Sequence, residues 1–176
     1  MPVSVKGVVE LRKALRAYAP DLAKGLNKEM GDALKPIARQ ARGFLPNNSQ
    51  VLSNWVGTGS RATGRFPQYD ATTARKGVTY SVAPSKPNRK GFRSLATIFN
   101  KSAAGAIYET AGRKSGDSVF VRNLDNKYPA RLEGRDKMRG RVIYRAWEGN
   151  QGKATAAVMQ AIQKATATFN ARSRIK

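Results

Sequence analysis

The chemistry that this sequence could support is set first by its cationic side chains. Lysine and arginine number 33 against 11 acidic residues, which gives a formal charge of +22. Between Gly57 and Lys101 the only acidic residue is Asp70. Cations on polar segments can neutralise phosphates in a salt-dependent, sequence-independent way. The candidate DNA-contacting or partner-contacting residues are Arg61, Arg65, Arg75, Lys76, Lys86, Arg89, Lys90 and Arg93, with Arg139 and Arg141 further along the chain.

The same positive charge has two other interpretations. It can be a solvated surface, or it can be a set of basic loops that meet an acidic protein neighbour. The aromatic residues Phe66, Tyr69 and Phe92 lie among the cations, but they are too sparse to form a base-stacking platform. No recognition-helix or zinc-finger pattern is visible. Contact with DNA and contact with protein therefore both stay open.

Catalytic groups are hard to assemble from the carboxylates of this sequence. Glu29 and Asp32 lie one turn apart on a predicted helix, and Glu133 and Asp136 lie among arginines and lysines that explain them by ion pairing. The chain has no Cys and no His, which excludes a zinc site with those ligands and a histidine general base. The Gly-rich stretch 57–64 lacks the phosphate-loop pattern. We expect no enzyme activity, no cofactor, no metal site and no small-molecule substrate.

A long helix over residues 20–45 is the main element that must position the cations. Its apolar residues recur at steps of three or four and form one stripe. Asp21 suits the positive end of the helix dipole, and Gly43 supplies the stop. Pro36 lies inside the pattern, which predicts either a kink near Asp32 or a break into two helices.

Two further helices are predicted at the ends of the chain. A shorter amphipathic helix covers residues 7–19. From 142 to 169 the apolar positions again follow a helical period, and many are alanines that allow close packing against the N-terminal helix. Gly149 and Gly152 each weaken this C-terminal helix by roughly 1 kcal/mol relative to alanine, so we expect it to fray or bend there.

The middle of the chain reads as strands and loops. The predicted strands are residues 77–83 and 118–122. Residues 57–76 and 84–94 are rich in Gly, Pro, Ser and Thr, and they predict long, basic, mobile loops. We expect such loops to become ordered only against a neighbour.

Together these elements predict an α+β fold, with a long N-terminal helix and a C-terminal helix packed on a small antiparallel sheet that carries long basic loops. The length predicts a single domain over 1–176, with a helical part at 1–46, strands and loops at 47–139, and the last helix and tail at 140–176. The candidate packing or interface anchors are Trp55, Tyr108 and Trp147.

Four motifs, taken in chain order, carry a resemblance to a known family. They are VKGVVELRKAL at 5–15, IARQARGFLP at 37–46, AIYETAG at 106–112 and RVIYRAW at 141–147, followed by the Ala-rich helix. In this order they resemble the neck or tail-completion proteins (head–tail joining or minor tail proteins) of long-tailed, double-stranded-DNA bacteriophages. The chain departs from that pattern at 46–52, where relatives typically show Pro followed by Thr-Gly and Leu. Its insert at 57–101 is also longer and more basic than is expected for a member of this family.

The resemblance implies a structural virion protein that forms a ring, a hexamer, around the DNA channel at the head–tail junction or upper tail. The implied partners are other copies of the chain, head-closure or connector proteins, tail-terminator or tail-tube proteins, and double-stranded DNA. The protein would lie in the virion neck or tail after assembly in the host cytoplasm. No apolar run approaches the length of a membrane span, so no membrane partner is expected. The alternative from a different class is a free, sequence-independent DNA-binding protein.

Overall fold

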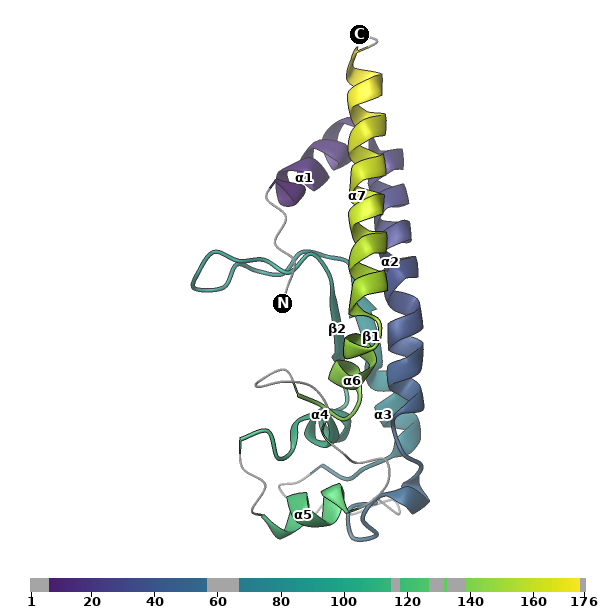
Figure 1. Ribbon diagram of the computed structural model, residues 1–176, viewed down its shortest axis with the longest axis vertical. Coiled ribbons are helices and arrows are strands. Elements are labelled where there is room, and N and C mark those ends of the chain that lie inside the picture. The colour runs from purple at the N-terminus through teal and green to yellow at the C-terminus, as the bar shows by residue number, and fades with distance from the viewer. Residues whose placement is uncertain (1–6, 57–66, 115–117, 127–131, 133–138, 175–176) are drawn as a thin grey trace. The chain divides into compact units, whose positions relative to one another are not determined.

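The computed structural model describes residues 7–56, 67–114, 118–126, 132 and 139–174 (Figure 1). Within these residues, helices at both ends and a two-stranded antiparallel sheet between them make this an α+β protein, as predicted. The elements are α1 (Val8–Tyr18), α2 (Pro20–Gly43), the 3-10 helix η1 (Asn48–Gln50), α3 (Ala71–Gly77), β1 (Val78–Ser81), β2 (Thr97–Asn100), α4 (Ala103–Thr110), α5 (Val119–Asp125), α6 (Ile143–Glu148) and α7 (Gln151–Arg174).

The chain forms two compact units, and neither is continuous in sequence. Unit 1 comprises residues 1–36, 80–97 and 151–176, and unit 2 comprises residues 37–79 and 98–150. The sequence predicted three consecutive parts, 1–46, 47–139 and 140–176. Each unit contains residues from all three of these parts. The expected single domain of 1–176 stays a prediction.

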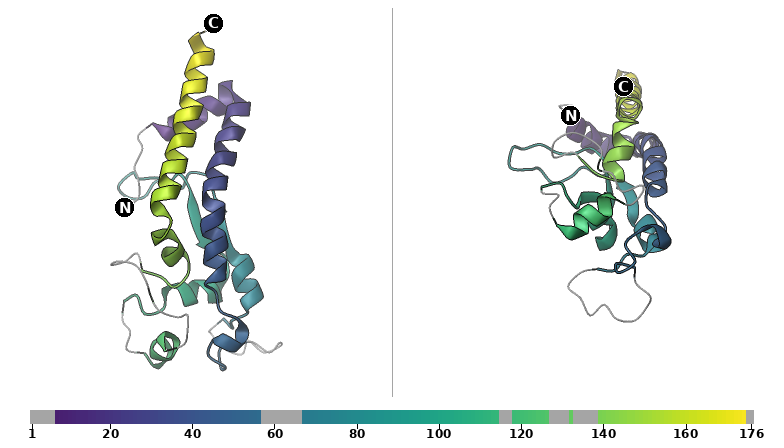
Figure 2. Two further views of the ribbon diagram at one scale, coloured as in Figure 1. Left: turned by 45° about the vertical axis from the view of Figure 1, so that its right-hand side comes forward. Right: turned by 60° about the horizontal axis from the view of Figure 1, so that its bottom comes forward.

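Unit 1 has a core built by α1, the first part of α2, and α7. In both views of Figure 2, α7 lies beside the first part of α2. The small residues of α7 face this core, so the predicted packing of the Ala-rich helix against the N-terminal helices is confirmed. The buried residues of the cluster are Val8, Leu15, Ala19, Leu26, Met30, Ala161, Ile162 and Ala165.

Ion pairs add polar ties between α2 and α7 in unit 1. Lys164 Nζ lies 2.6 Å from Glu29 Oε1, and Arg172 Nη1 lies 2.8 Å from Asp21 Oδ2. The segment that forms α7 contains no acidic residue, so both carboxylates come from α2. These side chains are largely exposed, and such pairs contribute little to stability individually.

Helix α2 is continuous through Pro36, so the predicted alternative of a break into two helices is wrong. Pro36 itself is exposed, whereas Leu34, Ile37 and Ala41 are buried. Burial of apolar side chains before and after the proline offsets the one backbone hydrogen bond that proline cannot make. The predicted C-terminal helix is interrupted at Gly149: α6 ends at Glu148, and α7 begins at Gln151 after two intervening residues.

The strand predicted over 118–122 is wrong, because this segment forms α5. Ser118 Oγ accepts the backbone N–H of Val121 at 3.1 Å, which caps the helix start. Val121 and Leu124, three residues apart, are both buried. The cap and the three-residue spacing therefore outweigh the strand preference of the valines. The strand predicted at 77–83 is confirmed as the shorter β1, Val78–Ser81.

The loop predicted over 57–76 is wrong at its C-terminal end, because residues 71–76 belong to helix α3. Residues 57–66 lie outside the described residues. Helix α3 begins at Ala71, where Asp70 Oδ1 accepts the backbone N–H of Thr73 at 2.7 Å. Arg75 and Lys76 therefore lie on a helix.

Helices α3 and α4 approach each other closely in unit 2, around the side chain of Asn100. A Cβ on Gly77 would lie 2.2 Å from Asn100 Oδ1, and a Cβ on Gly105 would lie 2.2 Å from Asn100 Nδ2. The Asn100 amide donates to Ala74 O at 3.1 Å and accepts from Ser102 N at 2.9 Å. Both positions need glycine because no side chain fits there.

Candidate nucleic-acid interface

The connection between β1 and β2 carries a two-limbed segment that we call the basic arm, residues 84–94. It is the teal loop that leads into β2 in Figure 1. Its limbs are joined by backbone hydrogen bonds from Ser85 N to Ser94 O at 2.9 Å and from Asn88 N to Phe92 O at 2.8 Å. Ser94 N also donates to Ser85 Oγ at 2.9 Å. The basic arm thus has a defined local conformation.

The tip of the basic arm is organised by Asn88. Its Oδ1 accepts the backbone N–H groups of Lys90 and Phe92, both at 2.9 Å, and its carbonyl oxygen accepts from Gly91 N at 2.8 Å. Gly91 has φ +74°, a conformation that glycine adopts readily. The expectation that 84–94 becomes ordered only against a neighbour stays a prediction, although the arm satisfies several of its own backbone groups.

The stem of the basic arm is anchored on the core of unit 1. Val82, before the arm, packs against the unit 1 cluster, and so do Leu95 and Ala96, after it. The apolar flanks hold the polar arm at both ends, so the arm emerges from a fixed base.

The basic arm concentrates exposed positive charge. Lys86, Arg89, Lys90 and Arg93 are all exposed, and the sequence holds no acidic residue between Asp70 and Glu109. Among the residues that the structure describes, none of these four cations forms an ion pair.

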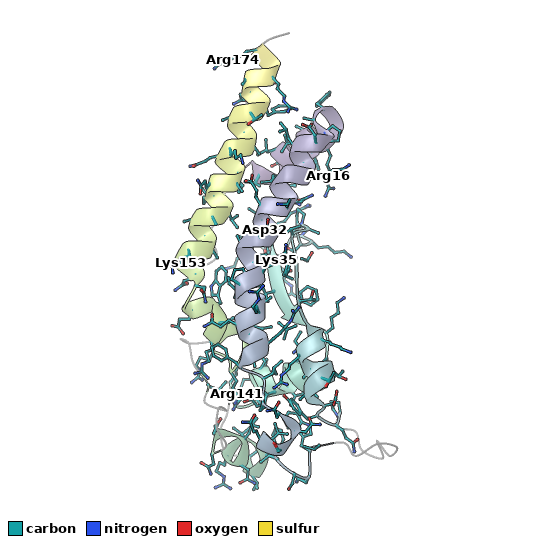
Figure 3. All side chains as sticks on the ribbon, turned by 90° about the vertical axis from the view of Figure 1, so that its right-hand side faces the viewer. Arg16, Asp32, Lys35, Arg141, Lys153 and Arg174 are labelled. Atoms are coloured by element: carbon teal, nitrogen blue, oxygen red, sulfur yellow. The ribbon has the colours of Figure 1, made fainter. Side chains whose placement is uncertain are left out.

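The helices of unit 1 carry cations in a different setting. Lys28 and Lys35 both pair with Asp32, at 3.3 and 2.6 Å, and Figure 3 shows the Asp32 and Lys35 side chains next to each other. Arg16 lies on α1, and Lys153 and Arg174 lie near opposite ends of α7 (Figure 3). Positive charge on the helices is thus spread out and partly neutralised.

Three of the four predicted contact residues that the structure describes in unit 2 bond within the fold. Arg75 Nη2 donates to Leu45 O and to Asn47 Oδ1, both at 2.8 Å. Arg139 Nη2 donates to Arg113 O at 3.1 Å, and Arg113 Nε donates to Arg139 O in return. Lys76 is exposed on α3. Arg61 and Arg65 lie outside the described residues.

Arg141, predicted as a surface contact, is completely buried, and that prediction is wrong. Its Nη1 donates to Tyr108 O at 3.0 Å and Ala111 O at 2.6 Å, which satisfies carbonyl groups at the end of α4. Its Nη2 pairs with Asp125 Oδ1 at 2.5 Å. Arg141 therefore joins α4 to α5 and has no surface left for a partner.

The three predicted anchors have different environments. Trp55 and Tyr108 are buried in unit 2, and Trp147 on α6 is half-buried. The Trp55 ring lies 5.2 Å from that of Tyr69, and its Nε1 donates to Pro67 O at 2.8 Å. Burial raises the pKa of Tyr108 to about 12, so its phenol stays neutral. Trp55 and Tyr108 thus act as packing residues.

Glu109 is an important residue that the sequence analysis did not single out. It is only 4% exposed, and its Oε2 accepts the backbone N–H groups of Val142 at 2.6 Å and Ile143 at 3.0 Å. Its Oε1 accepts from Tyr144 N at 3.1 Å and lies 3.7 Å from Arg113 Nη2. Burial raises the pKa of Glu109, against the lowering effects of the three N–H groups and Arg113.

Glu109 therefore caps α6 from another helix. The residue at the N-cap position of α6 is Val142, which has no side-chain acceptor. The absence of a capping side chain at Val142 was the sequence signal that a residue elsewhere must cap α6, because the free N–H groups at a helix start need an acceptor. With both carboxylate oxygens engaged, Glu109 serves structure rather than proton transfer.

Comparison of this chain with protein-family models, with curated protein sequences and with solved structures gave no match. Among the described residues, no group of three or more acidic side chains is placed to hold a metal ion. None of the helices in the described ranges is both long and apolar enough to cross a membrane. The exposed cations of the basic arm are therefore the feature of the described residues that best indicates a function.

Proposed function

We propose that this chain is a structural protein of a tailed-bacteriophage virion, part of a ring at the head–tail junction or upper tail that surrounds the DNA channel. The family resemblance of the four motifs supports this class of protein. The observation that carries the proposal is the basic arm, a preformed cationic segment anchored on a helical core. Such a segment suits a protein that makes electrostatic contacts with DNA or with neighbouring rings.

The proposed role is not catalytic. Three carboxylates of unit 1 support this, because Asp21, Glu29 and Asp32 are each paired with cations. In unit 2, Glu109 is held by backbone N–H groups. These four acidic groups are thus held in contacts within the fold, which does not suit them to act as a general acid or base.

The ring and its partners rest on the family resemblance. We propose a hexamer that stacks on head-closure or connector proteins and on tail-terminator or tail-tube proteins, with duplex DNA passing through it. Contacts between different faces of adjacent copies would close such a ring. The protein would reside in the neck or tail of the virion and assemble in the host cytoplasm.

The test is the location of the chain in particles. Antibodies raised against the purified chain are used to label virions released from cells that carry its gene, and the particles are viewed by negative-stain electron microscopy. The proposal expects label at the neck or upper tail. Absence of the chain from virions, together with a free pool of it in the cell, would overturn the proposal.

A free, sequence-independent DNA-binding protein is the second candidate, since the basic arm and the charge of +22 would serve that role too. Light scattering and a DNA-shift assay over a range of salt concentrations separate the two. Tight, salt-dependent binding by a monomer or dimer that does not assemble on particles favours the free protein. Assembly of the chain on particles favours the virion protein, whatever the salt dependence of its own DNA binding.

A further inference from the structure

We propose that the basic arm contacts the phosphates of duplex DNA through Lys86, Arg89, Lys90 and Arg93. This inference rests on the proposed function for where the DNA lies, and it names the surface of the chain that meets the DNA. The partner that we propose for the basic arm is DNA and not an acidic protein.

The first step of the argument is availability. Three other predicted contact residues already donate to groups inside the fold: Arg75 to Leu45 O, Arg139 to Arg113 O, and Arg141 to the end of α4. The four cations of the basic arm are exposed, and the described residues offer them no carboxylate partner. Neutralising them on phosphates would release condensed counterions, which drives binding.

The second step separates DNA from protein. Stable protein interfaces are centred on buried aromatic or large apolar side chains. The basic arm has one such residue, Phe92, and it is already half-buried. The rest of the arm is cationic, polar, proline or glycine. Phosphate contacts need only cations and polar donors, so the composition fits DNA better.

The third step sets the mode of contact. Asn88 is the only side-chain amide in the basic arm, and an amide reads adenine by using its oxygen and its nitrogen together. The Oδ1 of Asn88 is already occupied by the N–H groups of Lys90 and Phe92. The arm therefore has no free side-chain amide that could read adenine, and in this proposal its four cations contact the phosphates of the DNA backbone.

The fourth step concerns preorganisation. The limbs are bonded to each other, the tip is closed by Asn88, and the stem packs on the core of unit 1. A segment that already holds its bound shape loses less conformational freedom when it binds. The smaller loss of conformational freedom raises the affinity of the basic arm for DNA, compared with a polar segment that had no fixed shape before binding.

The test compares two variants of the full chain with equal loss of charge. The arm variant carries Lys86→Gln, Arg89→Gln, Lys90→Gln and Arg93→Gln. The matched control removes four exposed cations from the helices of unit 1: Lys13→Gln, Arg16→Gln, Lys24→Gln and Lys153→Gln. Fluorescence anisotropy measures binding to a labelled 20-base-pair duplex between 50 and 300 mM salt, and circular dichroism confirms that both variants are folded.

The expected result is a loss confined to the arm variant. Removing four phosphate contacts lowers the slope of log K against log salt by about 3.6 and weakens binding at 100 mM salt by roughly 10²- to 10³-fold. The control changes the slope by less than about 1. Equal losses in the two variants, or unchanged binding by the arm variant, would overturn the inference.

Particle assembly separates this inference from the proposed function. If the arm variant binds DNA normally but no longer joins heads to tails, the arm meets an acidic protein and the inference is wrong. If the arm variant loses DNA binding while the wild-type chain is absent from virions, the inference stands and the virion function fails.

Discussion

The carboxylate of Glu109 and the backbone N–H of Val142 lie 2.6 Å apart, which joins the end of α4 to the start of α6. Two further N–H groups of α6 bind the same carboxylate. Replacing Glu109 with alanine leaves these buried donors without an acceptor and Arg113 without its counter-charge. We expect Glu109→Ala to lower the free energy of unfolding by about 3 kcal/mol, measured by urea denaturation.

Glu148→Ala provides the control for this change. Glu148 is exposed at the other end of α6, so its removal is expected to alter stability by less than about 0.5 kcal/mol. Equal effects of the two substitutions would show that the Glu109 cap contributes nothing.

The burial of Glu109 also predicts a pH dependence. Its folded-state pKa is raised, so the folded chain binds the proton more tightly than the unfolded chain does. The stability contributed by this protonation is fully present below the unfolded pKa, about 4.3, and is lost as pH rises through the folded pKa. The free energy of unfolding of the wild type minus that of Glu109→Gln should therefore fall as pH rises through this window, and then level off. A difference that rises with pH in the same window would contradict the raised pKa.

Gly140 gives a steric test of the same contact. A Cβ at Gly140 would lie 2.0 Å from Glu109 Oε1, so Gly140→Ala must push the carboxylate away from the start of α6. We expect a loss of about 2–4 kcal/mol. Gly25→Ala on α2 is the control, because a Cβ there meets nothing within 4 Å. It should stabilise the protein by about 0.5–1 kcal/mol. A thermal melt that ranks the two variants the other way would refute the close packing.

The shape of the basic arm can be tested without changing its charge. Asn88→Ala removes the acceptor that closes the tip, so the arm must be ordered when it binds. We expect duplex affinity to fall about 5-fold, the equivalent of roughly 1 kcal/mol, with no change in melting temperature. Asn170→Ala on the exposed surface of α7 is the control and should leave affinity unchanged. Unchanged affinity of Asn88→Ala would show that the cations act without a fixed arm.

The sequence predicted the helices well because their signals are local. The apolar period of residues 20–45 identified α2, and the alanines at 161 and 165 identified the face of α7 that packs on the unit 1 core. Pro36 was given too much weight, since tertiary burial on both sides of it keeps the helix continuous. At 118–122 the prediction followed the β-branched residues and did not consider a helix cap at Ser118, which the structure shows.

The contacts that could not be predicted depend on residues far apart in the chain. Arg141 looked like one more surface cation, and only its position beside the carbonyl groups of Tyr108 and Ala111 shows that it is buried. Glu109 could not be recognised as the cap of α6, because its partners lie 33–35 residues later. Composition located the cations of the basic arm, and the hydrogen bonds of Asn88 gave them a defined arrangement.

The most direct test of the account is photo-crosslinking inside intact virions. Phe92 is replaced by p-benzoylphenylalanine, which keeps all four cations of the basic arm, and the same probe at Tyr18, which is 82% exposed on α1, serves as the control. After irradiation, we predict that the chain with the probe at position 92 is crosslinked to packaged DNA and that the chain with the probe at position 18 is not. Crosslinks from position 92 to protein alone, or virions that lack the chain, would contradict the account.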